Sequence, residues 1–490
     1  MPSLSEQIRD LTDDALASLV AGPGRDMVEQ IRHKLDTPLT VTVAGGVSSG
    51  KSTLVNALLG QRIAAVDAGE CTRIVTEFRF GVHERAEVVG TDGTVTVLPL
   101  ERGRVPEHLG RPVEQIASVV VHLSNALLRE LAVVDTPGLN TVTDANEETT
   151  ANFLGVSGRE GVQTAAAVSH ADALVFLLPL LRQADAEVLR GFSKLFGGSA
   201  LSAASSVAVL TKVDRLDRSA DPMRAALPIA ERMAAELRGV VSAVVPVMGL
   251  LAETSRAAVF TEADARSLVA IAAVDDELDR EDMLLSAEDF LRTDLIDIDI
   301  AQRRRLMSML DIHGIAVALA AVDQGAITAA GLLSHLGEHS GFDRLRREVI
   351  DRFAGQADLF KAHAALCDLR RASYLRTDGD NSRALRALRS PIERIELDPA
   401  MQRLRLLEVG RAVAAGELAL PPDLLDDVAA LSATTDVRSV VGAVQGRTQE
   451  VAAAGAARWA NWGNDPRRSP DESRFARIVK ETYELMWSDT

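Results

Sequence analysis

The stretch TVTVAGGVSSGKSTLVNALLG, residues 40–60, decides the fold of this chain. Within it, residues 45–53 match the pattern G-x-x-x-x-G-K-[ST]. An apolar, strand-like run precedes the pattern and a helix-like run follows it, which is the setting that a phosphate-binding loop requires. We therefore predict a P-loop here, and we favour it over the alternative of a glycine-rich turn that binds nothing.

The residues of this loop have predicted roles. The glycines let successive backbone N–H groups turn toward a β-phosphate, and the N-terminus of the following helix adds its positive dipole end. We expect Lys51 to reach the β- and γ-phosphates and Ser52 to bind Mg²⁺. The predicted nucleotide-binding residues of the loop are Gly45, Gly46, Ser48, Ser49, Gly50, Lys51, Ser52 and Thr53.

The motif DTPG, residues 135–138, ends the apolar run LAVV. An aspartate at the end of a strand can hold the Mg²⁺ shell, so we add Asp135 to the predicted metal and nucleotide residues. The N–H of Gly138 is expected to meet the γ-phosphate. The motif is short, but its position after the P-loop strengthens the prediction.

The motif TKVD, residues 211–214, ends the run SSVAVL and predicts the base-binding residues Thr211, Lys212 and Asp214. The carboxylate of Asp214 can accept two hydrogen bonds from guanine, through N1–H and N2–H₂. Adenine lacks this pair of donors, and an unpaired carboxylate costs about 1–3 kcal/mol. We therefore predict that the protein binds GTP and GDP rather than ATP.

Two weaker signals complete the predicted site. A nucleotide switch needs a threonine that senses the γ-phosphate through Mg²⁺, and Thr72 is the preferred candidate, with Thr76 as the alternative. Thr72 lies where an irregular stretch meets a strand, whereas Thr76 falls inside that strand. The run VVPVMG, residues 244–249, ends where a loop beside the base is expected, so we include Val247 and Met248.

The chain as a whole alternates short apolar runs with helical ones between residues 38 and 256, which predicts a mostly parallel sheet covered by helices. Residues 85–99 read as a hairpin that turns at Asp92-Gly93. Two amphipathic helices, in residues 1–37, are expected to pack on helices from elsewhere in the chain. Residues 257–490 are predicted to be helical almost throughout, with a packed stripe that runs from Ile350 to Cys367 through Phe360 and Ala364.

Composition limits the classes of function. The net charge of −17 argues against a nucleic-acid partner, and two cysteines in 490 residues favour a reducing cytosol. No signal peptide is expected, and the most apolar window, residues 314–333, is interrupted by Asp323, so we expect no membrane span. Any basic patch must be built from arginine, because the six lysines are scattered: Lys34, Lys51, Lys194, Lys212, Lys361 and Lys480.

These motifs together resemble the dynamin superfamily. The phrase TRIVTEFRFG is similar to the first switch of that family, and the spacing of 84 residues between Lys51 and Asp135 (135 − 51) fits its enlarged GTPase domain. The phrases GKSTLVNAL, VVDTPG, DALVFLL and VVPVMGLLA resemble, more narrowly, the isoniazid-inducible dynamin-like proteins of mycobacteria, and the length matches the shorter member. The resemblance is specific over 38–256 and diffuse beyond it.

The resemblance implies an α/β fold: a P-loop GTPase domain with a mostly parallel sheet, and a helical neck and stalk bundle formed by N-terminal and C-terminal helices. It implies that Ser48 helps to recruit a charge-compensating cation, so Lys51, Ser48 and Thr72 form the expected catalytic set. The expected ligands of Mg²⁺ are Ser52, Thr72 and Asp135.

Two departures concern hydrolysis. Eukaryotic dynamins carry a glutamine at the position of Val47, and Ras-like proteins carry one at the position of Leu139. A valine cannot orient water by a hydrogen bond. Binding of the nucleotide is therefore better supported than fast hydrolysis.

The function that we expect is that of a cytoplasmic GTPase, peripheral to the inner face of the cell membrane, which uses GTP-dependent assembly to remodel, fuse or tether bilayers. Its expected partners are a second copy through the GTPase domains, a second dynamin-like protein and a lipid surface. One alternative is a GTP-regulated partner subunit with little hydrolysis of its own. Another is a ribosome-assembly GTPase, which would need a basic appendage. Two arginine clusters are candidates for contact with lipid headgroups, and the alternative for both is salt bridges within this acidic chain: Arg303, Arg304 and Arg305, then Arg344, Arg346 and Arg347.

Overall fold

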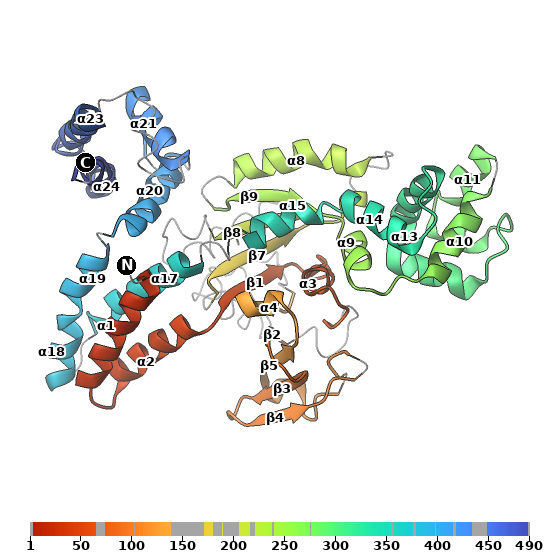
Figure 1. Cartoon of the computed structure of the whole chain (residues 1–490), viewed down its shortest axis with the longest axis horizontal. Coiled ribbons are helices and arrows are strands. Elements are labelled where there is room, and N and C mark those ends of the chain that lie inside the picture. Colours follow the sequence, from red (N-terminus) through yellow and green to blue (C-terminus); the bar gives the residue numbers. More distant parts are fainter. Residues whose placement is uncertain are drawn as a thin grey trace, which may run out of the picture.

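The computed structural model describes most of the chain, and the statements below concern that part. The described residues are 3–64, 74–101, 103–106, 108–138, 171–179, 189, 205–215, 221–237, 240–274, 276–351, 353, 357–375, 379–396, 398–414, 418–433 and 448–488. Figure 1 shows an α/β domain in the middle of the molecule with helices on both sides of it. The predicted fold class, an α/β GTPase domain with helical additions, is confirmed.

The described strands form one sheet in the order β4-β3-β5-β2-β6-β1-β7-β8-β9. The central and far strands are parallel, because β1 pairs in parallel with β6 and β7, and β8 pairs in parallel with β7 and β9. Antiparallel pairs join β2 to β6 and β3 to both β4 and β5. Their bounds are β1 Leu39–Gly45, β2 Thr76–Phe80, β3 Arg85–Gly90, β4 Val95–Leu98, β5 Ile116–Leu123, β6 Leu131–Asp135, β7 Ala173–Leu178, β8 Ser206–Leu210 and β9 Ala243–Pro246.

Most of these strands were predicted, and so was the β3–β4 hairpin, but β5 was missed. The buried residues of β5 are Ile116, Val119, Val121 and Leu123, so the alternation is broken after its first residue. At that place the register with β3 shifts between Val89 and Gly90. A bulge of this kind removes the regular period of two by which a half-buried strand is detected.

Each face of the sheet belongs to a different hydrophobic core. In β7, Val175 and Leu177 point into a core shared with helices from the N-terminal part of the chain, while Leu174 and Phe176 point into a second core on the opposite face. The helices closest to the sheet are α3 Lys51–Leu59, α4 Leu127–Glu130, α8 Pro222–Glu236, α9 Gly249–Arg256 and α15 Phe342–Arg346.

The first core continues into a set of helices that we call the N-terminal bundle, at the lower left of Figure 1. Its first two helices, separated by a break before Pro23, pack on α17, so segments more than 300 residues apart in the sequence lie side by side. The bundle consists of α1 Leu4–Ser18, α2 Pro23–Asp36, α17 Ala357–Ala372, α18 Gly379–Ala387 and α19 Arg389–Glu396.

The second core continues into five helices that we call the lobe, at the right of Figure 1. They lie between the last strand and α15 in the sequence, and α9 joins them to the sheet. The lobe consists of α10 Glu262–Ala272, α11 Glu277–Met283, α12 Ala287–Arg292, α13 Ile300–Asp323 and α14 Ala329–His339.

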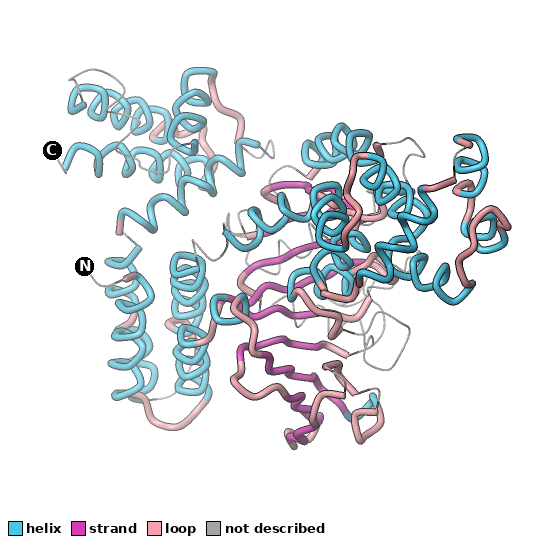
Figure 2. The backbone as a smooth tube through the Cα atoms, turned by 45° about the vertical axis from the view of Figure 1, so that its right-hand side comes forward, coloured by secondary structure: helices cyan, strands magenta, loops and turns pink. Residues whose placement is uncertain are grey.

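The remaining described helices have a core of their own, built around Trp459, and we call them the C-terminal bundle. They are α20 Pro399–Ala414, α21 Pro422–Ala433, α23 Thr448–Gly463 and α24 Pro470–Ser488. Figure 2 shows this bundle apart from the sheet and next to the N-terminal bundle. The range 257–490 thus contains helices of three groups, and the division of the chain at residues 37 and 256 stays a prediction.

The buried face of α17 differs from the predicted one. The predicted stripe in α17 is wrong beyond Phe360, because Ala364 is exposed and the buried residues are Ala362, Ala365, Leu366, Leu369 and Ala372. A π-helical segment, Arg347–Asp351, precedes this helix. The helix α17 packs against α1, α2 and α19, so its buried face is set by neighbours on more than one side rather than by a single apolar stripe.

One helix among the described residues, α13, is long and apolar enough to cross a membrane. Half of its most apolar window is buried inside the protein, and the helix is kinked at Asp311, whose φ and ψ are 55° and 178°. Residues such as Ile315 and Leu319 pack in the second core. Length and composition alone therefore do not distinguish a membrane-spanning helix from the core helix of a folded lobe.

Candidate functional site

The P-loop has the backbone that its glycines predict. Gly45 has a φ of 153°, and a Cβ on it would lie 2.6 Å from the carbonyl oxygen of Leu177. Gly50, with a φ of 96°, precedes the first turn of α3. Ser48 takes a φ of 56° although it is not glycine, which is unfavourable for a residue with a Cβ. The loop therefore follows a path that a chain without these glycines could not take.

Lys51, the first residue of α3, is folded back onto the loop. Its side chain is buried, and Nζ donates to the carbonyl oxygens of Gly45 at 3.2 Å and Gly46 at 2.9 Å. Burial lowers the pKa of Lys51, and the nearby carboxylate of Asp135 opposes this shift. The ammonium is thus held at the mouth of the loop, where the phosphates of a nucleotide would provide stronger partners than carbonyl oxygens.

Asp135 lies at the end of β6 and meets Ser52, whose Oγ donates to Asp135 Oδ2 at 2.8 Å. The other oxygen, Oδ1, is buried and has no hydrogen-bond partner among the described residues. Burial raises the pKa of Asp135 to about 6, against the effect of the Ser52 hydrogen bond and the Lys51 charge.

This donor set fits Mg²⁺. A serine hydroxyl and a carboxylate with one free oxygen are the hard oxygen ligands that Mg²⁺ takes together with phosphate oxygens and water. Ser52 and Asp135 would hold the ion, and a bound cation would satisfy the carboxylate oxygen Oδ1, which no described residue pairs with.

Gly138, the last residue of DTPG, lies directly against the P-loop. A Cβ on it would come within 2.8 Å of Val47 Cγ2 and 2.9 Å of Val47 Cα, so no other residue fits here without movement. The side chain of Val47 is 60% exposed. Val47 holds the position at which eukaryotic dynamins carry a glutamine. Its apolar side chain therefore faces solvent beside the predicted position of the γ-phosphate.

The two threonine candidates fare differently. Thr72 lies outside the described residues, as does Leu139, so their roles stay predictions. Thr76 is the first residue of β2, as expected of a residue inside the strand, and its side chain is buried. In the antiparallel pairing of β2 with β6, Thr76 lies directly opposite Asp135.

The predicted base-binding residues lie at the end of the neighbouring strands. Lys212 takes a φ of 55°, which turns the chain out of β8, and Asp214 follows in a short 3-10 turn. The ion pair between Asp214 Oδ2 and Arg215 Nε spans 4.0 Å, and the Arg215 side chain is 67% exposed. Thr211 Oγ1 is buried, and within the part of the chain that the structure describes it has no hydrogen-bond partner.

The loop after β9 is tied to both the sheet and the lobe. The N–H of Val247 donates to Leu210 O at 2.8 Å, and that of Met248 donates to Ser340 O at 2.9 Å. Because β1, β6, β8 and β9 are parallel, all these loops emerge from the same edge of the sheet, where ligands of such sheets bind. The structure thus brings the described parts of the predicted site together.

Sequence reasoning missed two residues next to the site. Asn56 is fully buried in α3, and Glu253 of α9 is 1% exposed and accepts a hydrogen bond from it. A polar residue inside the apolar run LVNALL was the only signal in the sequence. Its partner is 197 residues away, so no spacing could have indicated it.

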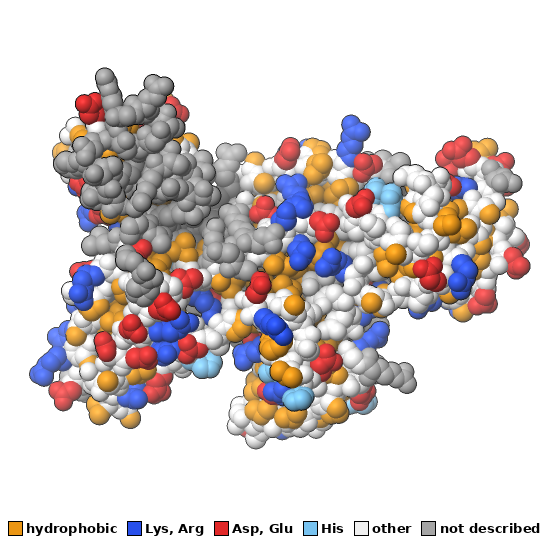
Figure 3. All heavy atoms as spheres, in the orientation of Figure 1, with side chains coloured by type: hydrophobic (Ala, Val, Ile, Leu, Met, Phe, Trp, Pro, Cys, Tyr) orange, Lys and Arg blue, Asp and Glu red, His pale blue; other side chains and the backbone are white. Residues whose placement is uncertain are grey.

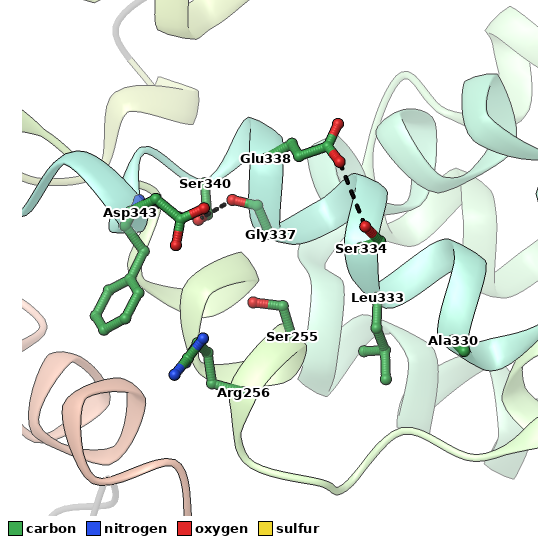
Figure 4. A pocket seen from close by; sticks show the side chains of 10 residues that line it. Ser255, Arg256, Ala330, Leu333, Ser334, Gly337, Glu338, Ser340 and Asp343 are labelled. Carbon is green, nitrogen blue, oxygen red and sulfur yellow. Dashed lines mark hydrogen bonds between the residues drawn. The ribbon is translucent and has the colours of Figure 1, made fainter. Parts of the chain in front are cut away.

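A hollow of about 370 Å³ lies elsewhere, between α9, α14 and α15 (Figure 4). It is lined by Arg256, Glu338 and Asp343 among others, and it shares no residue with the predicted phosphate-binding and base-binding residues. Ser340 Oγ donates to Gly337 O at 2.6 Å and Ser334 Oγ to Glu338 Oε1 at 3.3 Å along its wall. It is a feature of the junction between α9 and the lobe.

The predicted lipid-binding arginines divide into two kinds, and in the first cluster only Arg303 is wrong, whereas Arg304 and Arg305 are exposed and stay predictions. Arg303 is buried and donates to the carbonyl oxygens of Thr293, Ile296 and Ile298, so it holds the segment before α13 in place. Arg305 forms an ion pair with the buried Asp264 at 2.8 Å.

The second cluster is exposed: Arg344, Arg346 and Arg347 on and after α15. Figure 3 shows basic and acidic side chains interspersed on the face that it draws. These three arginines stay a prediction for contact with lipid.

The sheet, with its three motif loops at one edge, defines a P-loop GTPase domain. Residues 41–190 match the model of the Dynamin family. Over 352 residues, 70% of this chain and 69% of its counterpart, the sequence is 35% identical to the isoniazid-induced protein IniC of Mycobacterium tuberculosis. This chain belongs to the dynamin family.

Two further similarities are weaker. The isoniazid-induced protein IniA of the same species is 28% identical over 162 residues, which are 30% of this chain and 25% of that protein. A chain from a solved structure of an oligomerised bacterial dynamin pair overlaps 99% of this chain and 73% of its own length, at 12% identity and a TM-score of 0.37. That overlap is too loose to add to the family assignment.

Proposed function

We propose that this protein binds GTP and GDP with Mg²⁺ and hydrolyses GTP. It would act as a cytoplasmic protein, peripheral to the membrane, whose GTP-dependent assembly remodels, fuses or tethers bilayers. The observation that carries the proposal is the buried contact between Ser52 and Asp135, with the Lys51 ammonium beside it and Asp214 at the same edge of the sheet.

The phosphate end supplies charge and orientation. Lys51 would exchange its two carbonyl partners for phosphate oxygens, and the N–H groups around Gly50 would donate to the β-phosphate. Mg²⁺ held by Ser52 and Asp135 would neutralise charge on the phosphates. Asp214 would select guanine, because its carboxylate matches two donors that adenine lacks.

Hydrolysis needs a group that orients water, and Val47 offers none at the exposed tip of the P-loop. Thr72 and Ser48 remain the proposed contributors from this chain. We therefore expect turnover to depend on pairing of two GTPase domains, since a partner could complete the site or exclude water from it.

Membrane contact would come from the exposed arginines Arg344, Arg346 and Arg347. The net charge of −17 opposes binding to an anionic bilayer unless basic groups are concentrated locally. A single copy should therefore bind weakly, and assembly should multiply the contact by effective concentration.

The test is GTP turnover measured over a wide range of protein concentration, with and without liposomes. The rate per molecule should rise with concentration and rise further with liposomes. A rate that is measurable but flat across the range, with no response to lipid, would count against pairing and membrane action. Absence of turnover in every condition would refute hydrolysis.

A second candidate function is that of a GTP-regulated partner subunit of another dynamin-like protein, and the apolar, exposed Val47 favours it. Such a subunit would bind GTP, hydrolyse it poorly alone and reach the membrane only in a mixed assembly. Liposome co-sedimentation separates the two candidates. Sedimentation that occurs only after a second dynamin-like protein is added would support the subunit, and sedimentation of this chain alone would exclude it.

A further inference from the structure

The end of α3 carries a buried polar network that phosphate binding does not use. The Oδ1 atom of Asn56 accepts hydrogen bonds from the N–H of Ile63 at 3.0 Å and of Ala64 at 2.8 Å. Its amide nitrogen donates to Ala64 O at 3.2 Å. These bonds hold residues 63–64 against α3, just after Gly60 turns the chain with a φ of 68°. They fix the start of the connection from α3 to β2, in whose sequence Thr72 lies.

Glu253 of α9 supplies the remaining partner. Its Oε1 accepts from Asn56 Nδ2 at 2.8 Å, and its Oε2 pairs with Arg62 Nη2 at 2.9 Å. The Glu253 side chain is only 2% exposed, and a buried charge is unfavourable unless its oxygens are paired. Removing one partner of a buried, hydrogen-bonded charge pair is strongly destabilising, so the Glu253 carboxylate ties α9 to the end of α3.

The other side of α9 faces the lobe. Thr254, next to Glu253, is fully buried and its hydroxyl donates to Met309 O of α13 at 2.5 Å. Ser255 and Arg256 line the hollow shared with α14 (Figure 4). The start of the helix follows Met248 in the base loop. One short helix therefore contacts the phosphate-binding helix, the base loop and the lobe.

We propose that Glu253 is a positioning residue for GTP hydrolysis, which aligns the start of the α3–β2 connection with α9 and so couples the lobe to the nucleotide site. This inference rests on the proposed function. Glu253 acts through Asn56 and Arg62, while Lys51 and Asp214 are held by contacts of their own. Loss of the Glu253 charge should therefore change turnover more than it changes the binding of GDP.

The first test is Glu253→Gln, which keeps the shape and the bond to Asn56 but removes the charge that pairs with Arg62. We expect kcat for GTP to fall about tenfold, because small misplacements remote from the chemistry have effects of this order or larger. KM and the affinity for GDP should stay within about twofold of the parent values. Glu338→Gln, an exposed glutamate of α14, is the matched control and should change nothing.

The second test asks whether Glu253 and Arg62 act as a pair. Arg62→Gln should reproduce the defect, and the double variant Arg62→Gln/Glu253→Gln should recover to within about threefold of the parent, because two amides can hydrogen-bond in the same place. A double variant no better than the single ones would overturn the assigned pair. A parallel loss of GDP affinity in Glu253→Gln would mean a merely structural role, and an unchanged kcat would also overturn the proposal.

Failure of the proposed function can be distinguished from failure of the role inferred for Glu253. If the parent protein does not hydrolyse GTP, the proposed hydrolysis is refuted, but the role of Glu253 can still be tested. The measurement is then the ratio of the affinities for a non-hydrolysable GTP analogue and for GDP. Glu253→Gln should lower that ratio. An unchanged ratio would overturn the inference in that case too.

Discussion

The phosphate end and the base end of the proposed nucleotide site are built differently. At the phosphate end, Lys51 and the Oδ1 atom of Asp135 are buried, and each of the two side chains is held by a protein group at a short distance. At the base end, the side chain of Asp214 is 24% exposed, and its ion pair with Arg215 spans 4.0 Å. A buried charge interacts more strongly, and costs more to leave unpaired, than one in contact with water. The phosphate end should therefore decide whether a nucleotide binds, and the base end which one.

The largest effect on nucleotide affinity is expected from Lys51→Ala at the phosphate end. Removal of the buried ammonium should weaken both GTP and GDP by about 100-fold, or about 3 kcal/mol, because charge-assisted hydrogen bonds to the phosphates are lost. Calorimetry on the parent and the variant measures this. An affinity loss below about threefold would contradict the dominance of the phosphate end.

Asp214→Asn should change selectivity rather than binding as such. The amide donates where the carboxylate accepted. The affinity for guanine nucleotides relative to xanthine nucleotides should therefore fall by about 10- to 100-fold. Competition between GDP and xanthosine diphosphate is the measurement. Equal affinity of the parent protein for ATP and GTP would refute the assigned role of Asp214.

Asp135→Asn should stabilise the nucleotide-free protein. Because burial raises the pKa of this carboxyl from 3.8 to about 6, the folded state binds more protons than the unfolded chain between about pH 4 and 6. This contribution to stability is lost as the pH rises through that window, and it corresponds to about 3 kcal/mol at most. We expect a gain of about 1–2 kcal/mol at pH 7, since Asn keeps an acceptor for Ser52.

Urea unfolding of the Asp135 variant and the parent at pH 5 and pH 7, without nucleotide, checks this. Asp264→Asn is the opposite control, because Arg305, Thr261 and Gln302 hold the pKa of Asp264 below its usual range. A carboxyl of that kind stabilises the fold above its unfolded pKa, so its loss should destabilise the protein at pH 7. Destabilisation by Asp135→Asn at pH 7 would contradict the unpaired state of the carboxylate.

The smallest effect is expected at Arg215. The exposed ion pair with Asp214 should contribute less than about 0.5 kcal/mol, so Arg215→Ala should leave GDP affinity within about twofold. Fluorescence titration with a labelled GDP is sufficient. A loss of tenfold or more would show that the base end depends on charge pairing as strongly as the phosphate end does.

Local backbone chemistry explains what could be predicted. Gly45 and Gly50 are required by a loop that takes positive φ, and such a loop fixes Lys51 and Ser52 in sequence and in space. Parallel register then places Asp135 and Asp214 at the same edge, so the order of motifs was sufficient to assemble this part of the site.

What could not be predicted depends on distant contacts. The inward turn of Arg303 is set by carbonyl oxygens of residues 290–298, and no spacing in the sequence reports them. The buried face of α17 is set by its packing against α1, α2 and α19. The pairing of Asn56 with Glu253 joins residues 197 positions apart. Thr72 stays a prediction, since the described residues do not include it.

The N-terminal bundle has a consequence for synthesis. Ser5 contacts Asp358 across 353 residues, so α1 and α2 leave the ribosome long before the helix on which they pack. At roughly 5–20 residues per second, the wait for residues 357–372 lasts about 15–65 s. During that time the apolar side chains Ile8, Val28 and Ile31 have only the hairpin of the two helices to cover them. The bundle therefore closes only on chains whose GTPase domain has already been made, and shortened chains keep an apolar surface that chaperones and proteases recognise.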